Sequence, residues 1–158
     1  MDEKLRIRGE VSYKLTDKDG NVKEERVITN QIQNLGFAAI ASLLATDNPQ
    51  SEDTFDYMAI GSDTGQDVSA TGLATEITTD GGARRGGADV TATSETTNVA
   101  NDTIQFVTTW SFTGSLSITE AGIFNADSNG TMLAYQDFPA INVGDGDNLQ
   151  VTWKISFA

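Results

Sequence analysis

Two stretches toward the end of the chain alternate strictly between inward and outward side chains. Successive side chains of a strand point to opposite faces of its sheet, so each stretch predicts a strand with one buried face. The predicted buried faces are Ile104, Phe106, Thr108, Trp110 and Phe112 in residues 103–112, and Leu149, Val151, Trp153, Ile155 and Phe157 in residues 149–157. A chain with two such strands must bury the apolar face of each strand against another layer, which favours a β-rich fold.

Weaker alternation marks further strands. Residues 5–16 alternate, the turn sequence Asp17-Lys18-Asp19-Gly20-Asn21 follows, and residues 22–29 resume the pattern, which predicts a hairpin. Shorter strands are predicted at residues 55–60, 74–78, 88–93 and 131–135. We expect the C-terminal third to form an antiparallel meander, with Pro139 at a strand end or an edge.

One segment has helical spacing, at about residues 31–46. Asn30 can cap it, and Gln33 stands three residues on, as in a capping box. One apolar face packs onto the sheet or, alternatively, meets a partner; it comprises Ile32, Leu35, Ala39, Ile40, Leu43 and Leu44. The expected fold is therefore mainly β, an antiparallel β-sandwich with one packed α-helix. The 158 residues form a single domain with a long Gly-rich loop region around residues 61–101.

The composition of the chain argues against several classes of function. The chain has no Cys and no His, and 23 acidic residues against 10 basic ones give a net charge of −13. Such a chain repels phosphates, so we expect no direct contact with nucleic acid. No apolar run approaches the ~18 residues of a membrane helix, so we expect no membrane contact. A dispersed Asp-rich surface is typical of proteins in high salt, and an ordinary acidic protein is the alternative.

We expect no enzyme, because nucleophile sets that need His or Cys are impossible here. A pair of carboxylates remains conceivable, although nothing singles out two of them. Glu120 is the most interesting, since the Glu-Ala-Gly segment ending at Gly122 breaks the alternation and predicts a bend or bulge. There Glu120 is either an acid or base, or an acceptor of backbone N–H bonds that fixes the bend.

No cofactor is expected, and metal ligands stay unassigned. The turn at residues 17–21 invites a calcium interpretation, but an EF-hand fails because Val22 and Ile28 stand where Gly and a bidentate Glu are required. A plain hairpin turn is the preferred interpretation. A divalent cation at the Asp-rich turns is kept as an alternative.

Two of the ten cations, Arg84 and Arg85, stand side by side within the glycine-rich residues 81–87. Glycine on both sides predicts a mobile segment in an isolated subunit. The segment is either a solvated loop or a docking loop that meets an acidic patch on a neighbouring copy or partner.

Several motifs resemble one family in their order along the chain. They are Asn30-Gln31-Ile32-Gln33-Asn34-Leu35-Gly36, Tyr57-Met58-Ala59-Ile60-Gly61-Ser62, Leu73-Ala74-Thr75-Glu76, Arg84-Arg85, Ile118-Thr119-Glu120-Ala121-Gly122-Ile123-Phe124-Asn125, Thr131-Met132-Leu133-Ala134, Phe138-Pro139 and Val151-Thr152-Trp153-Lys154-Ile155. Together they resemble small structural proteins of tailed bacteriophages and tailed archaeal viruses, described as tail-fibre-like or capsid-accessory virion proteins. One departure is Tyr135, where the family pattern has a basic residue.

The resemblance implies a non-enzymatic virion component, β-rich with one helix and assembled in several copies. We expect it to self-assemble as a homo-oligomer on the particle of a tailed virus of a halophilic host, after synthesis in the host cytoplasm. Its partners would be major capsid or tail proteins, and its place a head decoration, a vertex turret, or the tail and baseplate. The alternative is a carbohydrate- or cell-surface-binding β-sandwich module, for which exposed rings of Tyr13, Tyr57 and Tyr135 would be the mark.

Overall fold

A computed structural model describes residues 6–43, 54–93 and 100–157 of the chain. It contains one short helix and eight antiparallel strands in a single curled sheet, with spatial order β3-β6-β7-β2-β1-β8-β5-β4. The elements are β1 (Ile7–Thr16), β2 (Val22–Ile32), α1 (Asn34–Leu43), β3 (Tyr57–Gly61), β4 (Asp89–Thr93), β5 (Thr103–Ser111), β6 (Leu116–Phe124), β7 (Met132–Val143) and β8 (Asn148–Phe157). The predicted mainly β class with one helix is confirmed.

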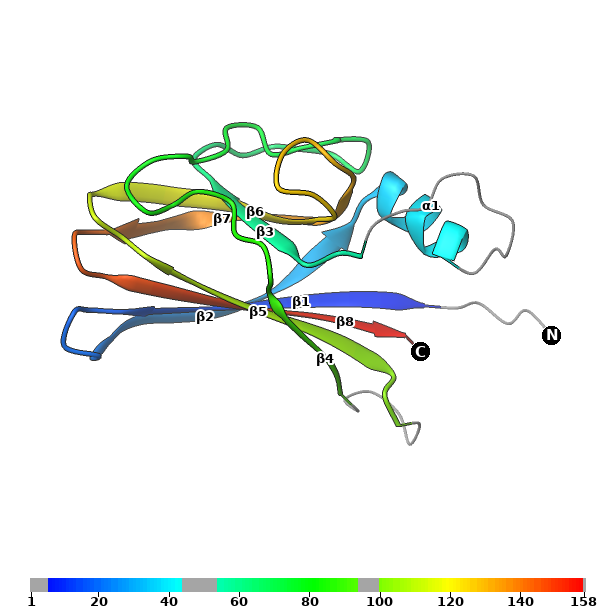
Figure 1. Ribbon diagram of the computed structural model, residues 1–158, viewed down its shortest axis with the longest axis horizontal. Helices are drawn as coiled ribbons and strands as arrows, with labels where there is room; N and C mark the ends of the chain where they lie inside the picture. The colour runs from blue at the N-terminus through cyan, green and yellow to red at the C-terminus, as the bar shows by residue number, and fades with distance from the viewer. Residues whose placement is uncertain (1–5, 44–53, 94–99, 158) are drawn as a thin grey trace.

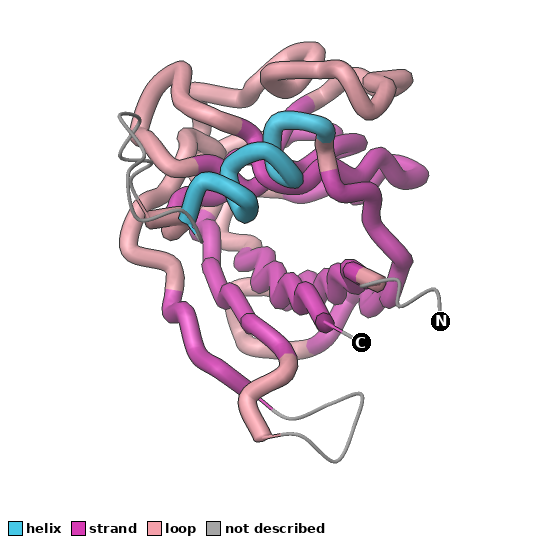
Figure 2. Tube along the Cα trace, turned by 90° about the vertical axis from the view of Figure 1, so that its right-hand side faces the viewer, coloured by secondary structure: helices cyan, strands magenta, loops and turns pink. Residues whose placement is uncertain are grey.

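The sheet folds back on itself to make two facing layers (Figure 1). β4, β5, β8, β1 and most of β2 form the lower layer, and β7, β6 and β3 form the upper one. β2 joins them, because it pairs with β1 over most of its length and with β7 only through Gln31 and Ile32. Figure 2 shows α1 beside the upper layer, at the end of the molecule where β1 begins and β8 ends.

The main core lies between the two layers. The alternating faces predicted for β5 and β8 point into it, and Trp110, Trp153, Leu149 and Val151 are fully buried. Tyr13 of β1 packs there against Phe138 of β7, with ring centroids 4.3 Å apart. The hydrophobic pattern thus identified the correct inner faces of these two strands.

The N-terminal hairpin is also confirmed, but the C-terminal meander is wrong. β5 and β6 are consecutive without being neighbours, and β8 lies between β1 and β5 instead of beside β7. The strand predicted at residues 74–78 is reduced to a single bridge between Glu76 and Gly61. Alternation identifies which residues are extended, but it carries no information about which strand becomes the neighbour.

The helix begins at Asn34, three residues later than predicted. Asn30 lies inside β2, and the backbone N–H of Phe37 donates to the carbonyl of Gln33 at 3.1 Å, so Gln33 opens the helix. Pairing of Gln31 and Ile32 with β7 keeps the preceding residues extended, which overrides the local capping pattern. The predicted end of the helix, residues 44–46, lies outside the described residues.

Pro139 lies within β7 at an irregular point of its ladder with β6. Ile118 pairs with Ile141 and Glu120 pairs with Asp137, so one residue of β6 faces three of β7. Proline is tolerated at such a bulge because it has no N–H to give to the ladder. The predicted break in β6 near Glu120 therefore coincides with this bulge.

Candidate functional site

Glu120 is a fully buried carboxylate, with 0% of its surface exposed. Its Oε1 accepts the backbone N–H of Thr75 at 2.8 Å, and its Oε2 accepts that of Ala74 at 3.0 Å. Both oxygens therefore hold the backbone of a loop that is 45 residues away in sequence. Of the two roles considered from the sequence, the structure shows the acceptor of backbone N–H bonds, although these N–H groups belong to the loop and not to the bend of β6.

Glycines leave room for this carboxylate. Gly61 of β3 stands opposite Glu120 in the β3–β6 ladder. A Cβ on Gly61 would collide with the Glu120 carboxylate and lie 2.6 Å from the carbonyl oxygen of Thr75. Gly122 is similarly confined, because a Cβ there would lie 3.0 Å from the Phe124 ring and 3.2 Å from Leu73. Both positions require close approach, which explains the glycines without any catalytic role.

Arg84 binds the next residue of the same loop, Glu76. Its guanidinium donates to both carboxylate oxygens of Glu76, at 3.0 and 2.6 Å, in a two-pronged ion pair. It also donates to the carbonyls of Ala126 and Asn129, at 2.9 and 3.0 Å. Its Cζ lies 3.8 Å from the centre of the Phe124 ring. Only 7% of the Arg84 side chain is exposed.

The two arginines predicted as a docking pair therefore have different environments. The guanidinium of Arg84 is engaged in contacts within its own chain, so it does not present its charge to a partner. Arg85 is exposed, and its guanidinium makes one long hydrogen bond, 3.3 Å, to the carbonyl of Gly81. Its backbone exchanges two 2.9 Å hydrogen bonds with Met58 at the outer edge of β3.

The glycine-rich segment is packed rather than loose. A Cβ on Gly82 would lie 2.5 Å from Ile77, and one on Gly86 would collide with the Tyr57 ring. The carbonyl of Ala83 accepts a 2.9 Å hydrogen bond from the indole of buried Trp110. The sequence predicted a mobile segment from its glycine content; in the structure, the glycines allow the loop to lie close against the sheet.

Residues 62–88, which we call the covering loop, lie over the outer face of the upper layer (Figure 1). Beneath it is a second small core of Ala59, Phe124, Met132 and Tyr135, against which Ala70 and Leu73 of the loop pack. The loop is also tied to the start of α1, since Asn34 donates its backbone N–H to Val68 at 2.9 Å. With its amide nitrogen facing the loop, Gln33 donates to the carbonyls of Asp67 and Val68.

We call the contacts of Glu120, Gly61, Glu76, Arg84 and Phe124 the loop anchor. It joins four segments that are scattered over more than 60 residues of sequence. The local sequence showed only one part of it, the break in alternation at Glu120. The pairing of Arg84 with Glu76 carries no such signal, because charged residues eight positions apart in a loop follow no helical or strand spacing.

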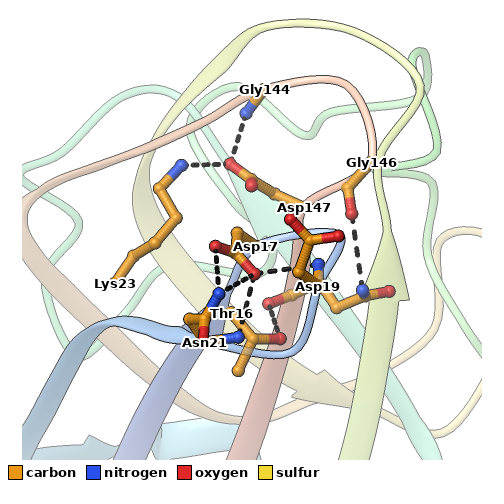
Figure 3. Close-up of polar contacts among 9 residues, drawn as sticks. Thr16, Asp17, Asp19, Asn21, Lys23, Gly144, Gly146 and Asp147 are labelled. Carbon is orange, nitrogen blue, oxygen red and sulfur yellow. Dashed lines mark hydrogen bonds and ion pairs between the residues drawn. The ribbon is translucent and has the colours of Figure 1, made fainter.

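The Asp-rich turns of the β1–β2 and β7–β8 connections lie side by side (Figure 3), at the end of the two layers away from α1 (Figure 1). The Asp17 carboxylate accepts the side-chain amide N–H of Asn21 at 3.0 Å and the backbone N–H groups of Asn21 and Asp19 at 2.8 and 2.9 Å. These hydrogen bonds, that of the Asn21 side chain first, hold the pKa of Asp17 below its usual value. Buried Asp147 accepts the N–H of Gly144 at 2.8 Å and pairs with Lys23 at 2.5 Å. These carboxylates stabilise turns, and no group of three metal-binding side chains occurs among the described residues.

The tyrosines offered for sugar contact are mostly interior. Tyr13 and Tyr135 are each 2% exposed, and only Tyr57 is partly accessible. Burial raises the pKa of Tyr13 well above its usual value and raises the pKa of Tyr135 to about 12. Neither Tyr13 nor Tyr135 presents its ring to a ligand.

In the part of the chain that the structure describes, no helix is long and apolar enough to cross a membrane. Comparison of the chain with protein-family models, with curated proteins and with solved structures finds no match.

Proposed function

We propose that this chain is a non-enzymatic structural component of a tailed-virus particle, assembled in several copies on the head or the tail. A halophilic host fits its charge of −13, because salt screens the repulsion between acidic copies. The site residues of such a protein are those that hold its shape, and its partners are further copies of itself and the major capsid or tail proteins.

One observation supports this proposal above the others. Four of the motifs that carry the family resemblance contribute residues to the loop anchor. They are the segment Tyr57–Ser62 through Gly61, the segment Leu73–Glu76 through Glu76, Arg84, and the segment Ile118–Asn125 through Glu120 and Phe124. Their charged groups bind backbone or one another within the chain. The shared pattern thus describes a way of fastening a loop to a sheet, which is what a scaffold needs.

Purified virus particles test the proposal. We expect mass spectrometry of the particles to detect this chain at a stoichiometry of many copies. Cryo-microscopy should then place its two-layered fold on the capsid surface or on the tail. Absence of the chain from washed, infectious particles would refute the proposal, whatever its behaviour in solution.

The alternative, a carbohydrate- or cell-surface-binding module, has no observation in its favour. Of its three candidate tyrosines, two are buried in the two cores. Glycan-array binding that a Tyr57→Ala substitution abolishes would revive it.

A further inference from the structure

An open sheet has two edge strands, here β3 and β4, and they differ in how their unpaired backbone groups are protected. The edge at β3 is covered by the chain itself. Arg85, Thr75 and Ile77 of the covering loop form backbone hydrogen bonds of 2.9 Å with Met58, Ser62 and Ile60 along it. This edge therefore offers few unpaired backbone groups to another molecule.

Most of β2 also lacks a partner strand on one side, although it is not an edge strand, and charged side chains protect this stretch. Lys23, Glu24, Glu25 and Arg26 follow one another there. Arg26 reaches across to the carbonyls of Pro139 and Ala140 on β7, and it pairs with Glu24. Consecutive charged residues on an edge are a common protection against pairing with other chains.

Among the described residues, the edge at β4 has neither protection. β4 pairs regularly with β5 from Asp89↔Val107 to Thr93↔Thr103, without a bulge, a proline or a lysine. Among the paired residues of β4 and β5, Asp89 is the only charged one. In a chain with a net charge of −13, the low charge of this edge reduces the repulsion between two copies that meet there.

β4 and the beginning of β5 also extend beyond the two-layered body. Both figures show them projecting from the lower layer, away from β3, β6 and β7 (Figures 1 and 2). Val90 pairs with Phe106, whose side chain is in the core, so Val90 is on the inner face of the sheet. It is nevertheless 45% exposed. Within the described part of the chain this inner-face valine is thus only partly covered, which leaves apolar surface beside the β4 edge.

We propose that β4 pairs with β4 of a second copy, antiparallel about a two-fold axis at Thr91, so that two sheets become one. The sequence of β4 suits this partner. In that register Asp89 faces Thr93, Val90 faces Ala92, and Thr91 faces itself, so no like charges stand opposite each other. A homodimer interface of this kind is isologous, with the same strand used by both copies.

The proposal rests on the self-assembly part of the proposed function and names its contact. A five-residue edge buries far less than the roughly 1,600 Å² of a standard interface, so the isolated pair is weak. Salt should strengthen it, since the Debye length falls from about 10 Å at 0.1 M to about 3 Å at 1 M.

The first experiment uses a single cysteine, because the natural chain has none. Facing residues of antiparallel strands have Cα atoms about 4.5–5.5 Å apart, which is within disulfide range. Thr91→Cys should form a species of about twice 16.8 kDa on mild oxidation in molar salt. Thr109→Cys, an exposed position on β5 outside the β4 edge, is the control and should stay monomeric. Equal cross-linking of both variants would overturn the proposal.

The second experiment swaps charge at the two-fold axis. Thr91→Asp and Thr91→Lys should each weaken self-association at least about tenfold, because like charges would face each other. Mixing the two variants should restore association, whereas Thr109→Asp should behave as the natural chain does. Sedimentation measures all four, and thermal unfolding verifies that each variant is folded. A natural chain that stays monomeric at every salt concentration, or a mixture that fails to recover, would overturn the pairing.

These outcomes separate the two proposals. A chain that is present in particles but insensitive at Thr91 contradicts the β4 contact alone. A chain that dimerises through β4 but is absent from particles contradicts the virion assignment alone.

Discussion

From the loop anchor we expect Glu120→Gln to destabilise the protein strongly, although the substitution replaces a single heavy atom of the side chain. The amide retains one oxygen for a backbone N–H, but its nitrogen must then face the other N–H, donor against donor. Losing a charged hydrogen bond costs about 1.5–3 kcal/mol, and a buried N–H without an acceptor costs about 1–3 kcal/mol more. Removing a buried charge returns part of this sum. We expect a net loss of about 3 kcal/mol.

For a chain of this size about 1 kcal/mol corresponds to roughly 2–4 °C, so thermal unfolding should move down by about 6–12 °C. The matched control is Glu25→Gln, the same chemical change at a side chain that is 63% exposed and 3.7 Å from Lys14. Its effect should stay within about 0.5 kcal/mol. Calorimetry of both variants decides the question. If the melting temperature of Glu120→Gln lies within roughly 2 °C of that of the control, the carboxylate does not hold the loop.

Three further predictions concern the same region and its surroundings. Arg84→Lys should cost about 2–3 kcal/mol in urea unfolding, because Lys cannot pair in two-pronged fashion or stack on a ring, while Arg85→Lys should be nearly neutral. Gly61→Ala should cost about 1–3 kcal/mol by the same assay, whereas Gly72→Ala, with open space around its Cα, should not. Burial raises the pKa of Tyr135 to about 12 from 10.0, so the unfolded chain loses that proton first and stability falls between these pH values. Denaturant titrations at several alkaline pH values should show this fall, and Tyr135→Phe should reduce it; an unchanged slope contradicts the burial argument.

The sequence predicted the parts of the fold that depend on side-chain periodicity. The inner faces of β5 and β8 and the first hairpin follow from alternation and turn residues, which act over a few positions. Strand order failed, because β8 lies between β1 and β5 through contacts that only the folded chain makes. The helix start failed for the same reason: two residues of β2 pair with β7 and remain extended.

The candidate site shows the same division. A break at Glu120 was visible, since Glu-Ala-Gly interrupts a strand pattern. The partners of Glu120 and Arg84 were not visible, because they lie in a loop whose path depends on close approach at Gly82 and Gly86. Glycine permits both mobility and tight packing, and only the surrounding atoms decide between them.

The neighbouring positions of β1 and β8 also bear on how the chain acquires its fold. These strands pair over ten residues, from Ile7↔Phe157 to Thr16↔Asn148, although paired residues are between 132 and 150 positions apart in the sequence. During synthesis β1 therefore keeps one side unpaired until β8 has left the ribosome. The hairpin with β2 gives it one neighbour in the meantime, and the charged residues of β2 keep that early ribbon from pairing with others.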